Sequence, residues 1–210
     1  MRLLVATRNA GKVRELERLL APLEDIEEVE LVGLDGFADV PDVVEDADTF
    51  EGNAAKKARQ MAAATGLPTL ADDSGLEVDA LDGAPGIRSA RYAGTHGDDE
   101  ANNDRLLRDL ADVPDARRTA RFRCALAFAD PEGSLGDDVH VVHGVVEGSI
   151  LRERRGTNGF GYDPLFLLRG DMRTTAELPP EAKNAVSHRA DAARKMLEFL
   201  QSYLRERSAR

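Results

Sequence analysis

The alternation of hydrophobic and polar positions in the first third of the chain predicts an α/β arrangement. The apolar run at 2–6 predicts a short buried strand, and leucines at helical spacing predict an amphipathic helix over 11–21. A second short strand is expected at 29–32. A strand, a helix and a strand in succession are typical of a sheet covered by helices.

The segment that follows is more polar. Residues 35–48 are rich in Asp, Gly and Pro and are interpreted as a loop, after which Thr49 is expected to cap a helix through 54–64. A short strand at 69–71 is expected to run into an acidic turn at 72–75.

The second half of the chain predicts further elements of both kinds. Helices are expected at 98–110 and from 188 to about 204, and a brief strand at 165–168. The runs 119–129 and 139–150 alternate with a period of two and are joined through a Pro-Glu-Gly turn, which favours a long hairpin. The expected fold is therefore α/β, with a mixed central sheet in two lobes and a substrate cleft between them.

Composition narrows the class of protein. The chain has 210 residues, of which 42% are hydrophobic, enough for one domain over 1–210 with a sizeable core. A net charge of −11 argues against nucleic acid and anionic membrane as partners, because both attract basic surfaces. The apolar runs are shorter than the roughly 18 residues that a membrane span needs. A single cysteine, Cys124, excludes an internal disulfide and suits the cytoplasm.

The junction of the first strand and helix is a candidate phosphate site. Backbone N–H groups at a helix start carry partial positive charge, and a lysine there adds a full charge. The segment concerned is Thr7, Arg8, Asn9, Ala10, Gly11 and Lys12. It lacks the full phosphate-loop motif, so an ordinary capped helix is the alternative.

Two adjacent carboxylates, Asp72 and Asp73, form the sharpest acidic feature. Adjacent acids repel unless a cation or hydrogen-bond donors compensate, and hard oxygen ligands suit Mg²⁺. Glu45 in the preceding acidic loop is a further candidate oxygen ligand. The alternative is a solvated acidic turn, in a chain with 39 acidic residues.

Two more segments carry possible binding groups. The glycine-rich stretch 156–164 places Phe160, Tyr162 and Asp163 where a base could stack and donate to a carboxylate, or where the aromatics fill the core instead. Lys183 and the sequence Ser-His-Arg at 187–189 form a basic group able to donate to phosphate or carbonyl oxygens. The alternative there is simple helix capping.

Taken together, the segments TRNAGK, TFEGNAAKKA, ADDSGLEVDALDGAPGIRSARYAG, FGYDPLF and SHR resemble the inosine/xanthosine triphosphate pyrophosphatases, from about residue 3 to 200. The resemblance implies a mixed α/β fold, a homodimer, Mg²⁺ as cofactor and a nucleoside triphosphate substrate. It implies hydrolysis of inosine, deoxyinosine and xanthosine triphosphates (ITP, dITP and XTP) to the monophosphate and pyrophosphate. Another modified nucleotide as substrate, or a non-catalytic nucleotide sensor, are the alternatives.

The resemblance also implies roles for individual residues. Thr7 to Lys12 would bind the triphosphate, Glu45 and Asp73 would hold Mg²⁺, and Asp73 would be the proton acceptor. Substrate contacts are expected from Ser74, Phe160, Gly161, Tyr162, Asp163, Lys183, His188 and Arg189.

Within that scheme, Asp72 is expected to share water activation, since a bound cation lowers the pKa of Asp73. Lys12 is expected to stabilise the growing phosphate charge, and His188 or Arg189 to pair with the 6-oxo group of the base. One departure is Gly52, where many relatives carry Glu; Glu51 sits one position earlier, about 100° away on a helix, and is not assigned as a ligand.

Overall fold

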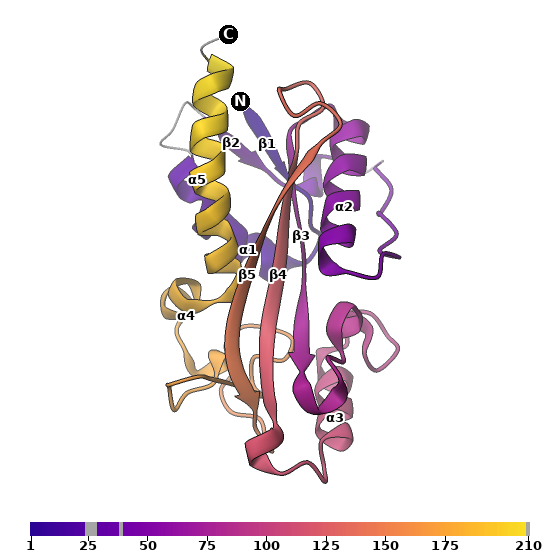
Figure 1. The fold of residues 1–210 in the computed structure, drawn as a ribbon, viewed down its shortest axis with the longest axis vertical. Helices are drawn as coiled ribbons and strands as arrows, with labels where there is room; N and C mark the ends of the chain where they lie inside the picture. Colours follow the sequence, from indigo (N-terminus) through magenta and orange to yellow (C-terminus); the bar gives the residue numbers. More distant parts are fainter. Residues whose placement is uncertain (24–28, 38–39, 209–210) are drawn as a thin grey trace. The chain divides into compact units, whose positions relative to one another are not determined.

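The computed structural model describes residues 1–23, 29–37 and 40–208 (Figure 1). Its described strands form one six-stranded sheet in the order β2-β1-β3-β4-β5-β6. Their bounds are β1 (Arg2–Val5), β2 (Glu30–Val32), β3 (Thr69–Val78), β4 (Thr119–Ala129), β5 (Val139–Ile150) and β6 (Phe166–Leu168). β1 pairs in parallel with β2 and β3, whereas β5 and β6 are antiparallel. The predicted mixed sheet is confirmed.

The described helices are α1 (Ala10–Leu20), α2 (Phe50–Thr65), α3 (Asp99–Asp109), α4 (Pro180–Val186) and α5 (His188–Ser208). Four of them match the predicted helices. The Thr49 side chain accepts the Gly52 N–H at 3.0 Å and caps α2 as expected. α4 was not predicted, because seven residues beginning with the second proline of a Pro-Pro pair show too little periodicity.

The predicted acidic turn at 72–75 is wrong. β3 continues through it to Val78, and both Asp72 and Asp73 are buried within the strand. A polar Asp-Asp-Ser-Gly sequence is typical of a turn when its side chains face water. Here cations and an amide from other elements contact Oδ2 of each carboxylate, so the strand does not have to end.

The chain divides into two compact units, and β3, β4 and β5 contribute residues to both. The first comprises Met1–Asp73, Cys124–Gly144 and Arg189–Arg210. Successive side chains on its strands point to opposite faces of the sheet. Leucines such as Leu3 and Leu70 pack with α1 and α5 on one face, and alanines such as Ala71 and Ala125 pack with α2 on the other. Figure 1 shows α5 and α2 on opposite sides of these strands.

The second unit comprises Ser74–Arg123 and Val145–His188. Its core joins Leu76 of β3, Leu106 of α3, Phe122 of β4 and Phe166 of β6. Phe122 and Phe166 contact each other with ring centroids 4.5 Å apart. In the described part of the chain, no helix combines the length and apolar character that a membrane crossing requires.

Candidate active site

The turn between β1 and α1 is built by its own side chains. The Asn9 Oδ1 accepts the Lys12 N–H at 3.0 Å and caps α1, and the Thr7 hydroxyl oxygen accepts the Asn9 N–H at 3.2 Å. Arg8 turns away and pairs with Asp42 at 2.7 Å. The capped-helix alternative therefore describes the backbone, and Ala10, Gly11 and Lys12 form the first helical turn.

The Lys12 side chain leads to Asp72, a carboxylate with no solvent exposure. Asp72 Oδ2 lies 3.1 Å from Lys12 Nζ and 3.3 Å from Arg189 Nε, and Arg189 Nη1 lies 2.6 Å from Glu15 Oε2. Burial alone would raise the pKa of Asp72, but the charges of Lys12, Arg189 and Lys57 outweigh burial and hold this pKa well below its usual range. Asp72 is therefore an anion at neutral pH and a weak base.

Asp73 follows Asp72 on the strand, so its side chain projects from the opposite face of the sheet. Its Oδ2 accepts a hydrogen bond from Asn53 Nδ2 at 2.9 Å. Burial raises the pKa of Asp73 and the nearby Glu45 carboxylate raises it further, while the Lys12 charge opposes both. Two neighbouring aspartates thus have pKa values displaced in opposite directions by their different surroundings.

Glu45 and Asp73 act on a shared cation. Lys57 forms an ion pair with Glu45 and donates to the Asp72 backbone carbonyl at 3.2 Å. Burial opposes the charged lysine, but Glu45, Asp72 and Asp73 together raise the pKa of Lys57. Over the described ranges, no group of three or more His, Cys, Asp or Glu is arranged to hold a metal ion. Glu45 and Asp73 thus place two carboxylates near Lys57.

Sequence reasoning missed Glu15, Asn53 and Lys57. A signal existed, because Glu15 follows Lys12 by three residues on α1, and Lys57 follows Asn53 by four on α2, so each pair shares a helix face. Glu51, which the sequence analysis did not assign as a ligand, has its Oε2 3.6 Å from His143 Nε2.

In the second unit, Asp163 is almost fully buried and ties together the glycine-rich loop. Its Oδ2 lies 2.5 Å from Lys183 Nζ and accepts the Phe160 N–H at 2.8 Å, while its Oδ1 accepts from the Thr175 hydroxyl at 2.8 Å. Lys183 Nζ also lies 4.8 Å from the centroid of the Phe160 ring. The predicted residues Phe160, Asp163 and Lys183 are therefore brought together.

Close packing in this loop depends on glycine. A Cβ at Gly159 would lie 2.0 Å from Asp163 Oδ2, and its φ of +79° is in the left-handed region. Tyr162 is buried in the core and donates its hydroxyl to the Ser89 carbonyl at 2.8 Å. For Tyr162 the structure thus realises the alternative in which the aromatic ring fills the core.

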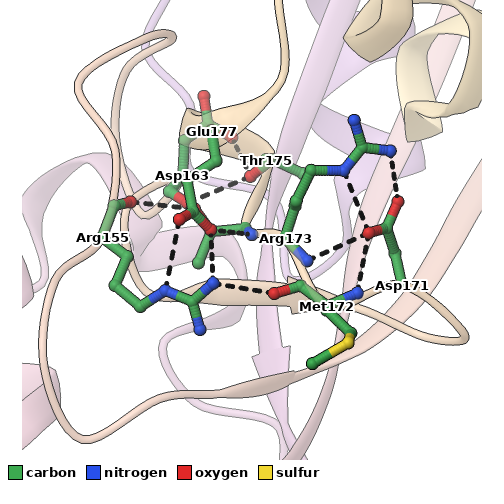
Figure 2. A network of polar contacts seen from close by, with 8 residues as sticks. Arg155, Asp163, Asp171, Met172, Arg173, Thr175 and Glu177 are labelled. Carbon is green, nitrogen blue, oxygen red and sulfur yellow. Dashed lines mark hydrogen bonds and ion pairs between the residues drawn. The ribbon is translucent and has the colours of Figure 1, made fainter.

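Ion pairs hold the start of the glycine-rich loop next to a short 3₁₀ turn at Thr175–Glu177 (Figure 2). Arg155 Nη2 lies 2.8 Å from Glu177 Oε2 and donates to the Met172 carbonyl at 2.7 Å. Asp171 and Arg173 form a separate pair at 2.7 Å within the neighbouring turn. Arg155 therefore joins the start of the glycine-rich loop to the turn that carries Thr175.

The remaining predicted residues lie near these groups in sequence. His188 is buried in the second unit, its ring stacked on Phe122 with centroids 4.9 Å apart. Ser74 is half-buried on β3 in the same unit. Arg189, the next residue after His188, belongs to the first unit with Asp72.

Comparison with known proteins gives long and close matches. A model of the Ham1 family matches residues 3–199. A protein of Streptomyces avermitilis named dITP/XTP pyrophosphatase is 50% identical over 203 residues, covering 97% of this chain and 98% of the relative. A Geobacter sulfurreducens protein of the same name is 54% identical over 191 residues, covering 91% and 92%.

Solved structures agree. A HAM1 protein from Coxiella burnetii superposes with a TM-score of 0.84 at 40% identity, covering 96% of this chain and 99% of that one. A nucleoside-triphosphatase, dITP/XTP pyrophosphatase, from Mycobacterium abscessus gives a TM-score of 0.75 at 50% identity, covering 95% and 100%.

Proposed function

The chain belongs to the Ham1 family, and from this membership we propose that it hydrolyses non-standard purine nucleoside triphosphates (ITP, dITP and XTP) to the monophosphate and pyrophosphate. The observation that carries the proposal is the pair of carboxylates on β3: Asp72 lies 3.1 Å from Lys12 Nζ, and Asp73, on the opposite face, accepts a hydrogen bond from Asn53 at 2.9 Å. Such a pair separates an anionic anchor from a proton acceptor, which hydrolysis requires and nucleotide sensing does not.

In this mechanism Asp73 accepts a proton from the attacking water. The water oxygen bonds to phosphorus, the α–β anhydride bond breaks, and pyrophosphate leaves with the bonding electron pair. Burial keeps the Asp73 carboxylate weakly hydrated, and the hydrogen bond from Asn53 orients its Oδ2.

We assign Lys12, with Asp72 and Arg189 beside it, to the phosphate groups of the substrate. The Lys12 ammonium stabilises negative charge that develops on the leaving oxygens, and Asp72 holds it in place from 3.1 Å. Because the pKa of Asp72 is lowered, we assign Asp72 this positioning role instead of the shared water activation expected from sequence. Arg189 lies between Asp72 and Glu15, so we assign it to orienting Asp72, and 6-oxo recognition falls to His188.

The donor set fits Mg²⁺. Glu45 and Asp73 are hard oxygen donors whose repulsion raises the pKa of Asp73, and a divalent cation would relieve that repulsion. Mg²⁺ is commonly bound by one or two carboxylates together with substrate phosphates, so two protein ligands suffice. When bound, Mg²⁺ neutralises phosphate charge and lowers the pKa of water. Lys57, now paired with Glu45, would keep its hydrogen bond to the Asp72 carbonyl.

The nucleoside is assigned to the second unit. We propose that the base stacks on Phe160, whose backbone is fixed by Asp163 and Lys183. His188 donates to the 6-oxo oxygen, an acceptor that adenine lacks. A donor facing the 6-amino group of adenine would stay unpaired, which disfavours ATP.

The test is a panel of ITP, dITP, XTP, GTP, ATP and modified pyrimidine triphosphates, with pyrophosphate and orthophosphate measured separately, with Mg²⁺ and with chelator. We expect pyrophosphate from the first three, and Asp73→Asn as the inactive control. Orthophosphate with a nucleoside diphosphate would place cleavage at the wrong bond. Turnover confined to another nucleotide would favour a different pyrophosphatase, and binding without turnover would favour a sensor.

The assembly and compartment are also proposals. The resemblance implies a homodimer, which light scattering at micromolar concentration would detect. A single buried cysteine and a substrate drawn from the nucleotide pool favour the cytoplasm.

A further inference from the structure

Two side chains of helix α3 form hydrogen bonds with the backbone of Gly161, the residue between Phe160 and Tyr162. The Gly161 N–H donates to Asp99 Oδ2 at 2.7 Å, and the Gly161 carbonyl accepts from Asn103 Nδ2 at 2.9 Å. The backbone N–H and the carbonyl of Gly161 are thus both hydrogen-bonded, each to a different side chain of α3.

The four-residue spacing of Asp99 and Asn103 on α3 allows both side chains to reach Gly161. Asp99 and Asn103 are four residues apart, so they lie on the same helix face one turn from each other. Asn103 is 2% exposed, and its Nδ2 also donates to the Asp99 carbonyl at 2.8 Å, which fixes the orientation of its amide. The contact to the Gly161 carbonyl is therefore made by a side chain with little freedom to move, and Asp99 binds the N–H of the same residue from the same helix face.

Gly161 adopts a left-handed backbone conformation, which glycine can do without strain. Its φ is +62°, in the left-handed region, and its two neighbours are also hydrogen-bonded, Phe160 to Asp163 and Tyr162 to Ser89. A backbone N–H bonded to a carboxylate forms a charge-assisted hydrogen bond, which is stronger than one between neutral groups. The contact with Asp99 thus contributes directly to where the Phe160 ring is presented.

We propose that Asp99 and Asn103 are positioning residues for nucleoside recognition: they hold Gly161 so that Phe160 is presented to the base. This inference rests on the proposed function, because it assigns Phe160 to the nucleoside. It adds a part of the molecule, the first turns of α3, that neither the sequence motifs nor the mechanism above includes.

The neighbouring Asp98 supplies a matched control. Asp98 and Asp99 are both acidic and adjacent at the start of α3, but Asp98 Oδ1 caps the helix by accepting the Ala101 N–H at 3.0 Å. Asp98→Ala therefore tests loss of helix capping and of one acidic charge, and Asp99→Ala tests loss of the contact to Gly161. Melting temperatures measured for both variants separate stability from recognition.

We expect Asp99→Ala to raise KM for ITP about tenfold, with kcat within about twofold of wild type, since loss of one charge-assisted hydrogen bond is of that size. Asp99→Asn retains a neutral acceptor oxygen and should recover part of the loss, with KM between those of wild type and Asp99→Ala. Asp98→Ala should leave KM unchanged. Hydrogen exchange of the peptide covering 156–163 should become faster in Asp99→Ala and not in Asp98→Ala, a readout independent of turnover.

Equal KM values and equal exchange rates in Asp98→Ala and Asp99→Ala would overturn the inference. A fall in kcat alone, with KM unchanged, would also overturn it, because positioning of the base acts through binding. These outcomes are separate from failure of the proposed function: if wild type does not cleave ITP, dITP or XTP, the function fails, and the exchange experiment still reports whether Asp99 orders the loop.

Discussion

Replacing Asp72 and Asp73 by asparagine, one at a time, exposes the different environments of these two neighbours. Both are aspartates on β3 and both are buried, at 0% and 6% exposure. Asparagine keeps the shape of the side chain and removes its charge. A difference between the two variants therefore reports the charges around each carboxylate and not its size.

Asp72→Asn should destabilise the fold. Its carboxylate lies within ion-pair distance of Lys12 and Arg189, and Arg189 is itself buried. Removing one partner of a buried ion pair typically costs about 3–5 kcal/mol. Arg189 keeps Glu15 at 2.6 Å, so we expect the lower end, about 3 kcal/mol. For a chain of this length that corresponds to a fall in Tm of roughly 6–12 °C.

Asp73→Asn should not lower the free energy of unfolding in this way. The pKa of Asp73 is raised, so the folded state disfavours its charged form and neutralisation removes an unfavourable term. Stability should be unchanged or slightly higher. Activity should nevertheless fall by a factor of about 10²–10⁴, because the proton acceptor is lost.

The pH dependence has opposite signs for the two residues. The pKa of Asp72 is lower in the folded than in the unfolded chain, so its stabilisation is present above about pH 4 and is lost as pH falls further. The pKa of Asp73 is raised, so its unfavourable contribution disappears at acidic pH and returns as pH rises through the folded value. The Tm gap between wild type and Asp72→Asn should therefore narrow in acid.

The assay is thermal unfolding at pH 7 and in acid, with chelator present so that metal binding does not contribute, beside pyrophosphate release with Mg²⁺. Equal losses of Tm in the two variants would refute the reasoning. So would a stable Asp72→Asn, since the structure would then misplace the cations around Asp72.

Three further changes test other parts of the structure. Lys183→Met breaks the buried pair with Asp163 and should lower the free energy of unfolding by about 3–5 kcal/mol, measured by denaturant titration, with KM for ITP raised; an unchanged KM would argue against Lys183 in nucleoside binding. Gly159→Ala forces a Cβ to 2.0 Å from Asp163 Oδ2 at a left-handed φ, so it should destabilise by at least about 1–3 kcal/mol and raise KM, whereas wild-type kinetics would contradict the close packing. Burial, with the nearby Asp72 charge, raises the pKa of Cys124 to about 12, so a thiol reagent at pH 8 should label the chain only after unfolding; rapid labelling of the native protein would count against this.

The sequence predicted the kinds of element well, because periodicity depends on which face of each element is buried. The family resemblance placed Lys12 and Asp72 in one site and Phe160, Asp163 and Lys183 in another, and the structure brings each set into contact. Local patterns suffice where a residue's environment is set by its near neighbours in the chain. The capping of α1 by Asn9 is such a case.

Only the tertiary structure decided what each carboxylate and cation does. In the sequence, Asp72 and Asp73 are adjacent, and only the family resemblance gives them different roles. On β3 they project from opposite faces, one toward Lys12 and Arg189, the other toward Asn53. Arg189 likewise reads as a base contact and proves to be buried beside two acids. The reason is that the electrostatic environment of a side chain depends on its distances to residues far away in the sequence, such as Glu15 and Arg189. Hydrophobic periodicity reports which face of an element is buried and does not predict those distances.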